Sequence, residues 1–216
     1  MRDYHEKTRQ VWDEKAEQGW GEGGEPAPYF LEFYKKHKPE LGNNVLDVGS
    51  GKGRYLIPLA QDGFRIVGLE PSEGMITTAK AKIEERQLSA SLVHGESVAL
   101  PFGNKSFDFV LSIGAIHHNT WDDIQKSFAE VSRILRDGKL FLFQGRSVND
   151  TAQTREPIPD TGYTAVDQEG SKEGVLQHYF TKEELLKLAV QHGFDVAEGP
   201  TEVIHERGDN PGRKSA

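Results

Sequence analysis

Residues 45–54 read Val45-Leu46-Asp47-Val48-Gly49-Ser50-Gly51-Lys52-Gly53-Arg54. The apolar residues on either side of the acid are typical of a buried strand, and three glycines at alternate positions follow them. Glycine carries no Cβ and permits positive φ, so another group can approach the backbone closely at this turn. The pattern becomes helical from residue 54 to residue 60. We therefore expect a strand, a tight turn and a helix, with backbone N–H groups facing outward to receive a carboxylate or phosphate.

The spacing of the glycines separates two classes of nucleotide ligand. A dinucleotide fold requires Gly-x-Gly-x-x-Gly, and Arg54 occupies the position of the third glycine. The carboxylate of Asp47 would repel a pyrophosphate but attract an ammonium group. A ligand that carries both an ammonium and a carboxylate, such as the amino-acid end of S-adenosylmethionine, suits both ends of the turn. The alternative is a glycine-rich connection that only permits tight packing.

A second acid follows the next apolar run. Residues 64–69 form that run, and Glu70 ends it, followed by Pro71 and Ser72. An acid at the end of the second strand, roughly 20 residues after the glycine turn, hydrogen-bonds ribose hydroxyls in doubly wound sheets. The alternative is an ordinary exposed carboxylate at a strand end.

Together these features resemble the class I S-adenosylmethionine-dependent methyltransferases. The first motif of that family reads acid-x-Gly-x-Gly-x-Gly, which residues 47–53 match without a gap. Three later segments resemble, in order, the family's third strand, its fourth strand and the loop beside the methyl group: residues 93–102, 106–112 and 113–118. The resemblance covers residues 40–145. It implies an α/β fold with a doubly wound, mostly parallel sheet and helices on both faces.

The resemblance also implies a cofactor site for S-adenosylmethionine. By this match, Glu96 accepts a hydrogen bond from the adenine amino group and Ser97 offers a backbone N–H to the ring. Glu96 is one methylene longer than the aspartate that is usual there. The complete set of cofactor-binding residues that we expect is Asp47, Gly49, Ser50, Gly51, Gly53, Glu70, Pro71, Met75, Glu96, Ser97 and Ser112.

His117 is the candidate catalytic residue. The resemblance places it near the methyl group, and an imidazole can take a proton from an acceptor near neutral pH. The alternative is a histidine that packs beside the cofactor or hydrogen-bonds a backbone carbonyl. His178 is a second candidate base. His117 and His118 have no partner at i, i+4 and no carboxylate at ligand spacing, so we expect no metal site.

Composition limits the possible partners. The chain has 216 residues, a formal net charge of −8 and no cysteine. This acidity disfavours nucleic acid as a partner, because binding phosphates requires clustered Lys and Arg. No apolar stretch approaches the ~20 residues of a membrane span, and residues 1–6 lack the apolar part of a signal peptide. We expect a cytoplasmic protein acting on a small-molecule acceptor; a protein or RNA methyltransferase and a non-catalytic cofactor-binding module are the alternatives. Neither the acceptor nor the oligomeric state follows from the sequence.

The flanking segments are expected to complete a single domain over residues 1–216. Residues 1–38 predict two cap helices, whose aromatic residues Trp12, Trp20 and Tyr29 either line the acceptor site or pack in the core. Residues 146–178 show weak periodicity, so they form either a lid over the acceptor or a solvated, partly disordered loop.

The remaining pattern predicts the helix starts and the end of the sheet. Ser72, Thr120 and Thr181 are placed as helix N-caps. Residues 194–205 are expected to be a sixth strand. Residues 208–216 are turn-like with no apolar run, so we expect the final antiparallel strand of the family to be missing.

Overall fold

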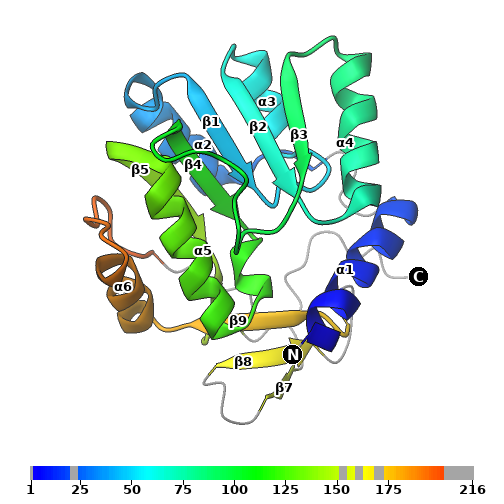
Figure 1. Ribbon diagram of the computed structural model, residues 1–216, viewed down its shortest axis with the longest axis vertical. Coiled ribbons are helices and arrows are strands. Elements are labelled where there is room, and N and C mark those ends of the chain that lie inside the picture. The colour runs from blue at the N-terminus through cyan, green and yellow to red at the C-terminus, as the bar shows by residue number, and fades with distance from the viewer. Residues whose placement is uncertain (1, 20–23, 151–154, 159–162, 168–172, 202–216) are drawn as a thin grey trace.

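The computed structural model describes residues 2–19, 24–150, 155–158, 163–167 and 173–201. Its main sheet has five parallel strands in the order β3-β2-β1-β4-β5 (Figure 1). The chain starts at the centre of the sheet, extends to one edge and returns to build the other, which confirms the doubly wound prediction. The strands are β1 (Asn44–Val48), β2 (Arg65–Glu70), β3 (Ala90–His94), β4 (Phe107–Ile113) and β5 (Leu135–Gln144).

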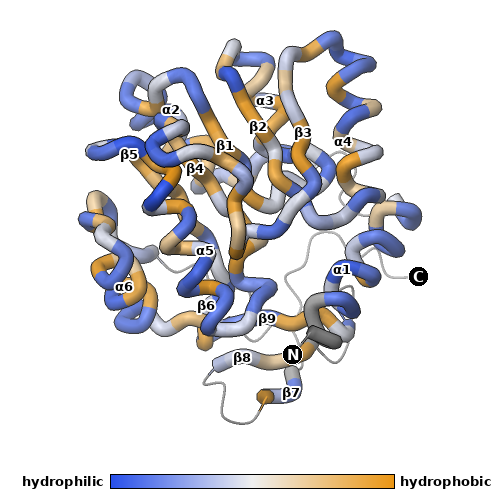
Figure 2. Tube along the Cα trace, in the orientation of Figure 1, coloured by the Kyte–Doolittle hydropathy of each residue, from blue (hydrophilic) through white to orange (hydrophobic). Residues whose placement is uncertain are grey.

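Helices cover both faces of this sheet, as predicted. Alternate residues of β4 show the division, since Phe109 and Leu111 pack with one group of helices and Val110 with the other. Figure 2 shows the hydrophobic residues concentrated along the central strands. One face carries α2 (Pro28–His37), α3 (Leu56–Gln61) and α4 (Glu73–Glu85), and the other carries α5 (Trp121–Ile134) and α6 (Lys182–Gln191).

All three predicted N-caps are confirmed. The Ser72 hydroxyl accepts from the Met75 N–H at 3.1 Å, and Thr120 and Thr181 accept in the same way at the starts of α5 and α6. Each hydroxyl satisfies an N–H that the helix itself leaves without a partner. Two short 3-10 helices, η1 (Lys38–Glu40) and η2 (Ile116–His118), precede β1 and α5.

A second, smaller sheet follows the main one in the chain, in the order β6-β9-β8-β7. Its strands are β6 (Arg146–Ser147), β7 (Arg155–Pro157), β8 (Thr164–Asp167) and β9 (Leu176–Phe180). Every residue of β9 is buried, so the expectation of a solvated loop is wrong there. The pattern of residues 176–180 does not predict this strand, because it lacks the regular apolar and polar alternation of a half-buried strand.

The expected sixth strand is wrong over its described part. Residues 194–201 form no strand, and residues 202–205 lie outside the described residues. Phe194 instead packs on Phe141 of β5, with ring centroids 5.4 Å apart, and Gly199 and Pro200 interrupt the extended pattern. Within the described residues the main sheet has no antiparallel strand; the tail at 208–216 lies outside them.

The N-terminal helix α1 (Arg2–Glu17) crosses from the start of α4 to β9 (Figure 1). At one end of this crossing, the Leu176 N–H of β9 donates to the Thr8 hydroxyl at 3.2 Å. The helix α1 therefore connects the larger sheet to the smaller one.

Among the described residues, no helix has the length and apolar character to cross a membrane.

Candidate functional site

The glycine turn lies at the carboxyl end of β1 and is closed by its own chain. The N–H groups of Gly49 and Ser50 both donate to the Leu69 carbonyl, and the Gly53 N–H donates to Ser50. The Gly51 N–H donates to Glu70. The expectation that these amides face outward for a ligand is therefore wrong, because β2 and the turn itself satisfy them.

Two glycines show where the turn is full and where it is open. Gly49 has φ +77°, and a Cβ there would lie 2.1 Å from the Ala115 Cβ. Gly51 has φ +51°, but a Cβ there would meet nothing within 4 Å. Gly49 is thus required by packing against the loop after β4, whereas Gly51 borders open space into which a ligand can fit.

Asp47 is the most distinctive group of the site. It is 1% exposed, and its Oδ2 has no hydrogen-bond partner among the described residues. Burial, together with the smaller effect of the nearby Glu70 carboxylate, raises the pKa of Asp47 to about 7. A buried carboxylate oxygen without a donor is costly, and a cationic ligand group would remove that cost. The Ser50 hydroxyl in the turn is also buried, and no described residue is hydrogen-bonded to it.

Glu70 lies beside Asp47 at the end of β2, and its two oxygens are bonded to backbone on both sides. Oε2 accepts from the Gly51 N–H at 2.9 Å, and Oε1 accepts from the Ser72 N–H at 3.0 Å. Burial raises the pKa of Glu70 to about 7, although these two N–H groups act in the opposite direction. Each oxygen keeps a further lone pair, so Glu70 can still accept from a ligand hydroxyl.

The two residues expected at the adenine differ in their surroundings. Glu96 is exposed and forms an ion pair with Arg9 of α1 at 3.7 Å. The Ser97 hydroxyl bonds the Ser127 hydroxyl of α5 at 2.8 Å, so its side chain faces the helix and not the site. The prediction for Ser97 concerns its backbone N–H, which would donate to the adenine ring, and the position of its side chain does not affect it.

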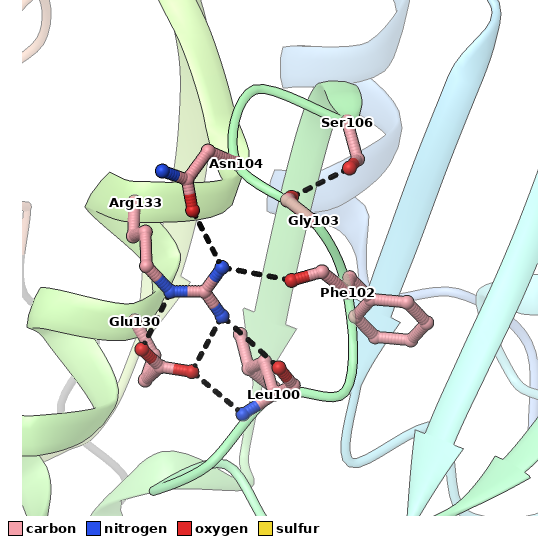
Figure 3. Close-up of polar contacts among 7 residues, drawn as sticks. All are labelled: Leu100, Phe102, Gly103, Asn104, Ser106, Glu130 and Arg133. Atoms are coloured by element: carbon pink, nitrogen blue, oxygen red, sulfur yellow. Dashed lines mark hydrogen bonds and ion pairs between the residues drawn. The ribbon is translucent and has the colours of Figure 1, made fainter.

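The loop after these residues is fixed to α5 by one guanidinium group (Figure 3). Arg133 binds both oxygens of Glu130, at 2.8 and 2.7 Å, and also donates to the carbonyls of Leu100 and Phe102. Glu130 in turn accepts from the Leu100 N–H at 2.8 Å. Charged hydrogen bonds of this bidentate kind are strong and directional, so they hold the loop that follows Glu96 and Ser97 against α5.

The remaining predicted cofactor residues lie at strand ends or in the adjoining helix. The Pro71 carbonyl is hydrogen-bonded to His94 Nε2 at 2.9 Å. Met75 is buried in the first turn of α4, and the fully buried Ser112 accepts from the Ile116 N–H at 3.4 Å. The structure therefore brings Asp47, the turn, Glu70, Pro71 and Ser112 to the carboxyl ends of adjacent strands, where open α/β sheets bind ligands.

His117 lies in η2, next to the loop against which Gly49 packs. It is 1% exposed, and its ring centroid lies 4.1 Å from that of His118. His118 Nδ1 is hydrogen-bonded to the Leu176 carbonyl at 3.0 Å, and its ring contacts Trp12 edge to face at 5.2 Å. The helix α1 and strand β9 thus enclose the loop that carries His117.

The second candidate base, His178, is held inside the protein. His178 is fully buried, with Nδ1 bonded to the Thr164 hydroxyl at 2.9 Å and Nε2 to Glu184 at 3.2 Å. Burial lowers its pKa, and both ring nitrogens are already paired. Tyr29 is 37% exposed, and Trp20 lies outside the described residues.

Sequence reasoning missed two residues that join α1 to the cofactor region. Asp13 accepts hydrogen bonds from Ser72 and Gly74, and the buried Lys52 donates to the Ala16 carbonyl at 3.0 Å. Lys52 occupies a position of the glycine motif that the family pattern leaves unspecified, and its positive charge was the available signal. Asp13 gave no signal, because an acid on a charged helix is usually solvated.

No group of three or more His, Asp and Glu side chains within the described residues could hold a metal ion. A hollow of about 280 Å³ lies between α1 and residues 173–174, and it is lined by side chains of both charges, among them Lys7, Lys15 and Glu14. None of the predicted site residues borders it. The candidate site is therefore the one at the strand ends, where the buried carboxylates of Asp47 and Glu70 lie.

Comparisons with known proteins agree with this geometry. Residues 45–138 match the family model described as a methyltransferase domain. A protein of Encephalitozoon cuniculi named as a methyltransferase is 32% identical over 164 residues, covering 73% of each chain. Another so named, from Geobacillus sp. (strain WCH70), is 28% identical over 160 residues, covering 73% of this chain and 72% of its own.

Among solved structures, the fold is similar to that of the 1,6-didemethyltoxoflavin-N1-methyltransferase of Burkholderia thailandensis. The TM-score is 0.67 at 19% identity, over 88% of this chain and 78% of the other. That structure contains 1,6-didemethyltoxoflavin and S-adenosylhomocysteine. Fold, site and relatives together define a class I methyltransferase. The chain belongs to the methyltransferases, and its fold is that of the class I enzymes.

Proposed function

We propose that this protein transfers the methyl group of S-adenosylmethionine to a small-molecule acceptor. The observation that carries the proposal is the enclosure of the His117 loop, which is buried beneath α1 and β9 through His118, Trp12 and Leu176. A compact acceptor can be enclosed in this way, whereas a macromolecule would need an open face. The Burkholderia enzyme of similar fold, whose structure holds a small aromatic compound, is in line with this.

The residues at the strand ends fit the cofactor. Asp47 Oδ2, which has no partner in the described part of the chain, would accept from the ammonium group, and the buried Ser50 hydroxyl would donate to the carboxylate. Glu70 would accept from the ribose, and the space beside Gly51 leaves room for the backbone approach. When bound, S-adenosylmethionine supplies a methyl group that its sulfonium already activates toward a nucleophile. We propose that residues 1–38 and 146–178 close this single domain over the acceptor.

Because the methyl group is activated, the chain contributes mainly alignment and the exclusion of water. The enclosure by α1 and β9 provides the exclusion. His117 is the residue we propose as general base, where the acceptor carries a proton to be removed. The alternative role of His117 is packing beside the cofactor, and its complete burial is compatible with both.

The experiment is a screen of candidate acceptors by thermal shift in the presence of S-adenosylhomocysteine, followed by turnover of the compounds that stabilise the protein. Methylation of a small molecule is the expected result. Turnover only on protein or RNA would favour the macromolecular alternative, and tight cofactor binding without turnover on any class would favour a non-catalytic module. The net charge of −8 weighs against RNA.

The role of His117 is tested separately with His117→Ala. If His117 is the base, kcat falls by about 10²-fold or more and the inflection of the pH–rate profile near neutral pH disappears. An unchanged profile would exclude His117 from proton transfer. S-Adenosylhomocysteine affinity, measured in parallel, distinguishes this role from packing, because a packing residue would alter the affinity.

A further inference from the structure

The helix α1 is attached directly to the cofactor region by one carboxylate. Asp13 Oδ1 accepts from the Ser72 hydroxyl at 2.6 Å and from the Gly74 N–H at 3.2 Å. Both partners belong to the segment that follows Glu70 and begins α4. Asp13 therefore binds, from another part of the chain, the first turn of the helix that starts next to the ribose acid.

The same contact continues to the glycine turn through hydrogen bonds alone. The Ser72 N–H donates to Glu70 Oε1, and Glu70 Oε2 accepts from the Gly51 N–H. Three hydrogen bonds in series thus join Asp13 to Gly51. Burial is the main cause of the raised pKa of Glu70, and the negative charge of Asp13 acts in the same direction.

Two further contacts hold α1 in the same position. The Lys52 ammonium, buried in the glycine turn, donates to the Ala16 carbonyl near the C-terminus of α1. Gly74 allows close approach, because a Cβ there would lie 2.9 Å from the Ala16 Cβ. A cation at the end of a helix also interacts favourably with its dipole.

The other contacts of α1 reach the acceptor side. Trp12, adjacent to Asp13, packs its ring edge to face against His118, and Thr8 accepts from Leu176 of β9. The helix α1 therefore contacts the segment after Glu70, the glycine turn and the residues that surround His117. Figure 1 shows α1 spanning these regions.

We propose that Asp13 is a positioning residue, which docks α1 on the start of α4, holds Ser72 and Glu70 in place and so sets Trp12 against His118. The inference rests on the proposed function, because it concerns the same site. Docking of α1 and binding of the cofactor then stabilise each other, since a coupling between two sites is reciprocal. Lys52 provides the second attachment of the same helix.

The test compares Asp13→Ala and Asp13→Asn with Glu17→Ala, which removes an exposed carboxylate from the same helix. Calorimetric titration with S-adenosylhomocysteine gives the affinity, and hydrogen exchange of residues 6–17 with and without the ligand gives the docking of α1. We expect Asp13→Ala to weaken binding about tenfold, the effect of losing about one charged hydrogen bond. Glu17→Ala stays within twofold, and Asp13→Asn is partly rescued because its carbonyl oxygen still accepts.

Hydrogen exchange supplies the readout that a purely structural role would not change. We expect the ligand to slow exchange in residues 6–17 of the parent protein, and we expect this slowing to be lost in Asp13→Ala. Lys52→Met, which keeps the aliphatic stem but not the ammonium, gives the same loss by an independent change. Parent-like affinity in both Asp13 variants, or no effect of the ligand on α1 exchange, would overturn the inference alone. Failure of the parent protein itself to bind S-adenosylhomocysteine would overturn the proposed function.

Discussion

The cofactor half of the molecule and its acceptor half are held together by different kinds of contact. In the cofactor half, residues 44–113, backbone groups make the contacts of the glycine turn. Its N–H groups donate to Leu69 and Glu70, and Gly49 packs closely against Ala115. In the proposed acceptor half, which comprises α1, η2 and β9, side chains link one element to another, as between Trp12 and His118 and between Thr8 and Leu176. A glycine packed this closely tolerates few substitutions, whereas contacts between single side chains can change one at a time.

The largest loss of stability is expected from adding a side chain at Gly49 in the glycine turn. Gly49→Ala places a Cβ against Ala115 at positive φ, so we expect the free energy of unfolding to fall by about 3 kcal/mol and ligand binding to be lost. Gly51→Ala is the matched control, because only its φ is unfavourable; it should lose about 1 kcal/mol. Urea denaturation measures both. Equal losses in the two variants would contradict the packing argument.

The Arg133 network tests whether the cofactor half also depends on one side chain. Arg133→Ala leaves Glu130 and the carbonyls of Leu100 and Phe102 without their donor, and we expect a loss of about 2 kcal/mol in unfolding free energy. Lys126→Ala, which breaks an exposed pair with Asp123, should cost about 0.5 kcal/mol or less. A loss for Arg133→Ala no larger than that control would show that the loop holds without this network.

The buried carboxylates predict an unusual pH dependence of stability. Asp47 and Glu70 have pKa values near 7 in the folded protein, above those of the unfolded chain, so the folded state holds more protons between about pH 4 and pH 7. Their contribution therefore makes the ligand-free protein less stable as the pH rises through this window. Melting temperatures from pH 5 to pH 8 measure it, and Asp47→Asn should flatten the decline. A decline of the same steepness in that variant would contradict the assignment.

The smallest effect is expected in the acceptor half. Glu184→Gln weakens the contact with His178 Nε2 and should reduce the unfolding free energy by about 1 kcal/mol or less, with S-adenosylhomocysteine affinity unchanged within twofold. Lys187→Ala, in an exposed pair with Glu183, is the control and should have no measurable effect. A tenfold loss of ligand affinity in Glu184→Gln would show that the two halves are not separable in this way.

The same difference explains how much the sequence could predict. A strand, an acid and spaced glycines at residues 45–54 predict the strand, turn and helix with which the doubly wound sheet begins. The outward-facing amides were predicted wrongly, since the sequence does not show that Leu69 and Glu70 take up the N–H groups of the turn. The strand β9 and the role of Asp13 depend on long-range partners, Thr8 and Ser72, which no local pattern reveals. The contacts within the acceptor half could therefore not be predicted from the sequence.

The central claim is that Asp47 and the glycine turn bind the amino-acid end of the cofactor. Calorimetric titration of S-adenosylhomocysteine into the parent protein and Asp47→Asn at pH 7.5 tests it most directly. The variant removes a buried charge, so we expect it to melt no lower than the parent but to bind at least about tenfold more weakly, as the loss of one charged hydrogen bond implies. Equal affinity in the two proteins, or no binding to the parent, would contradict the claim.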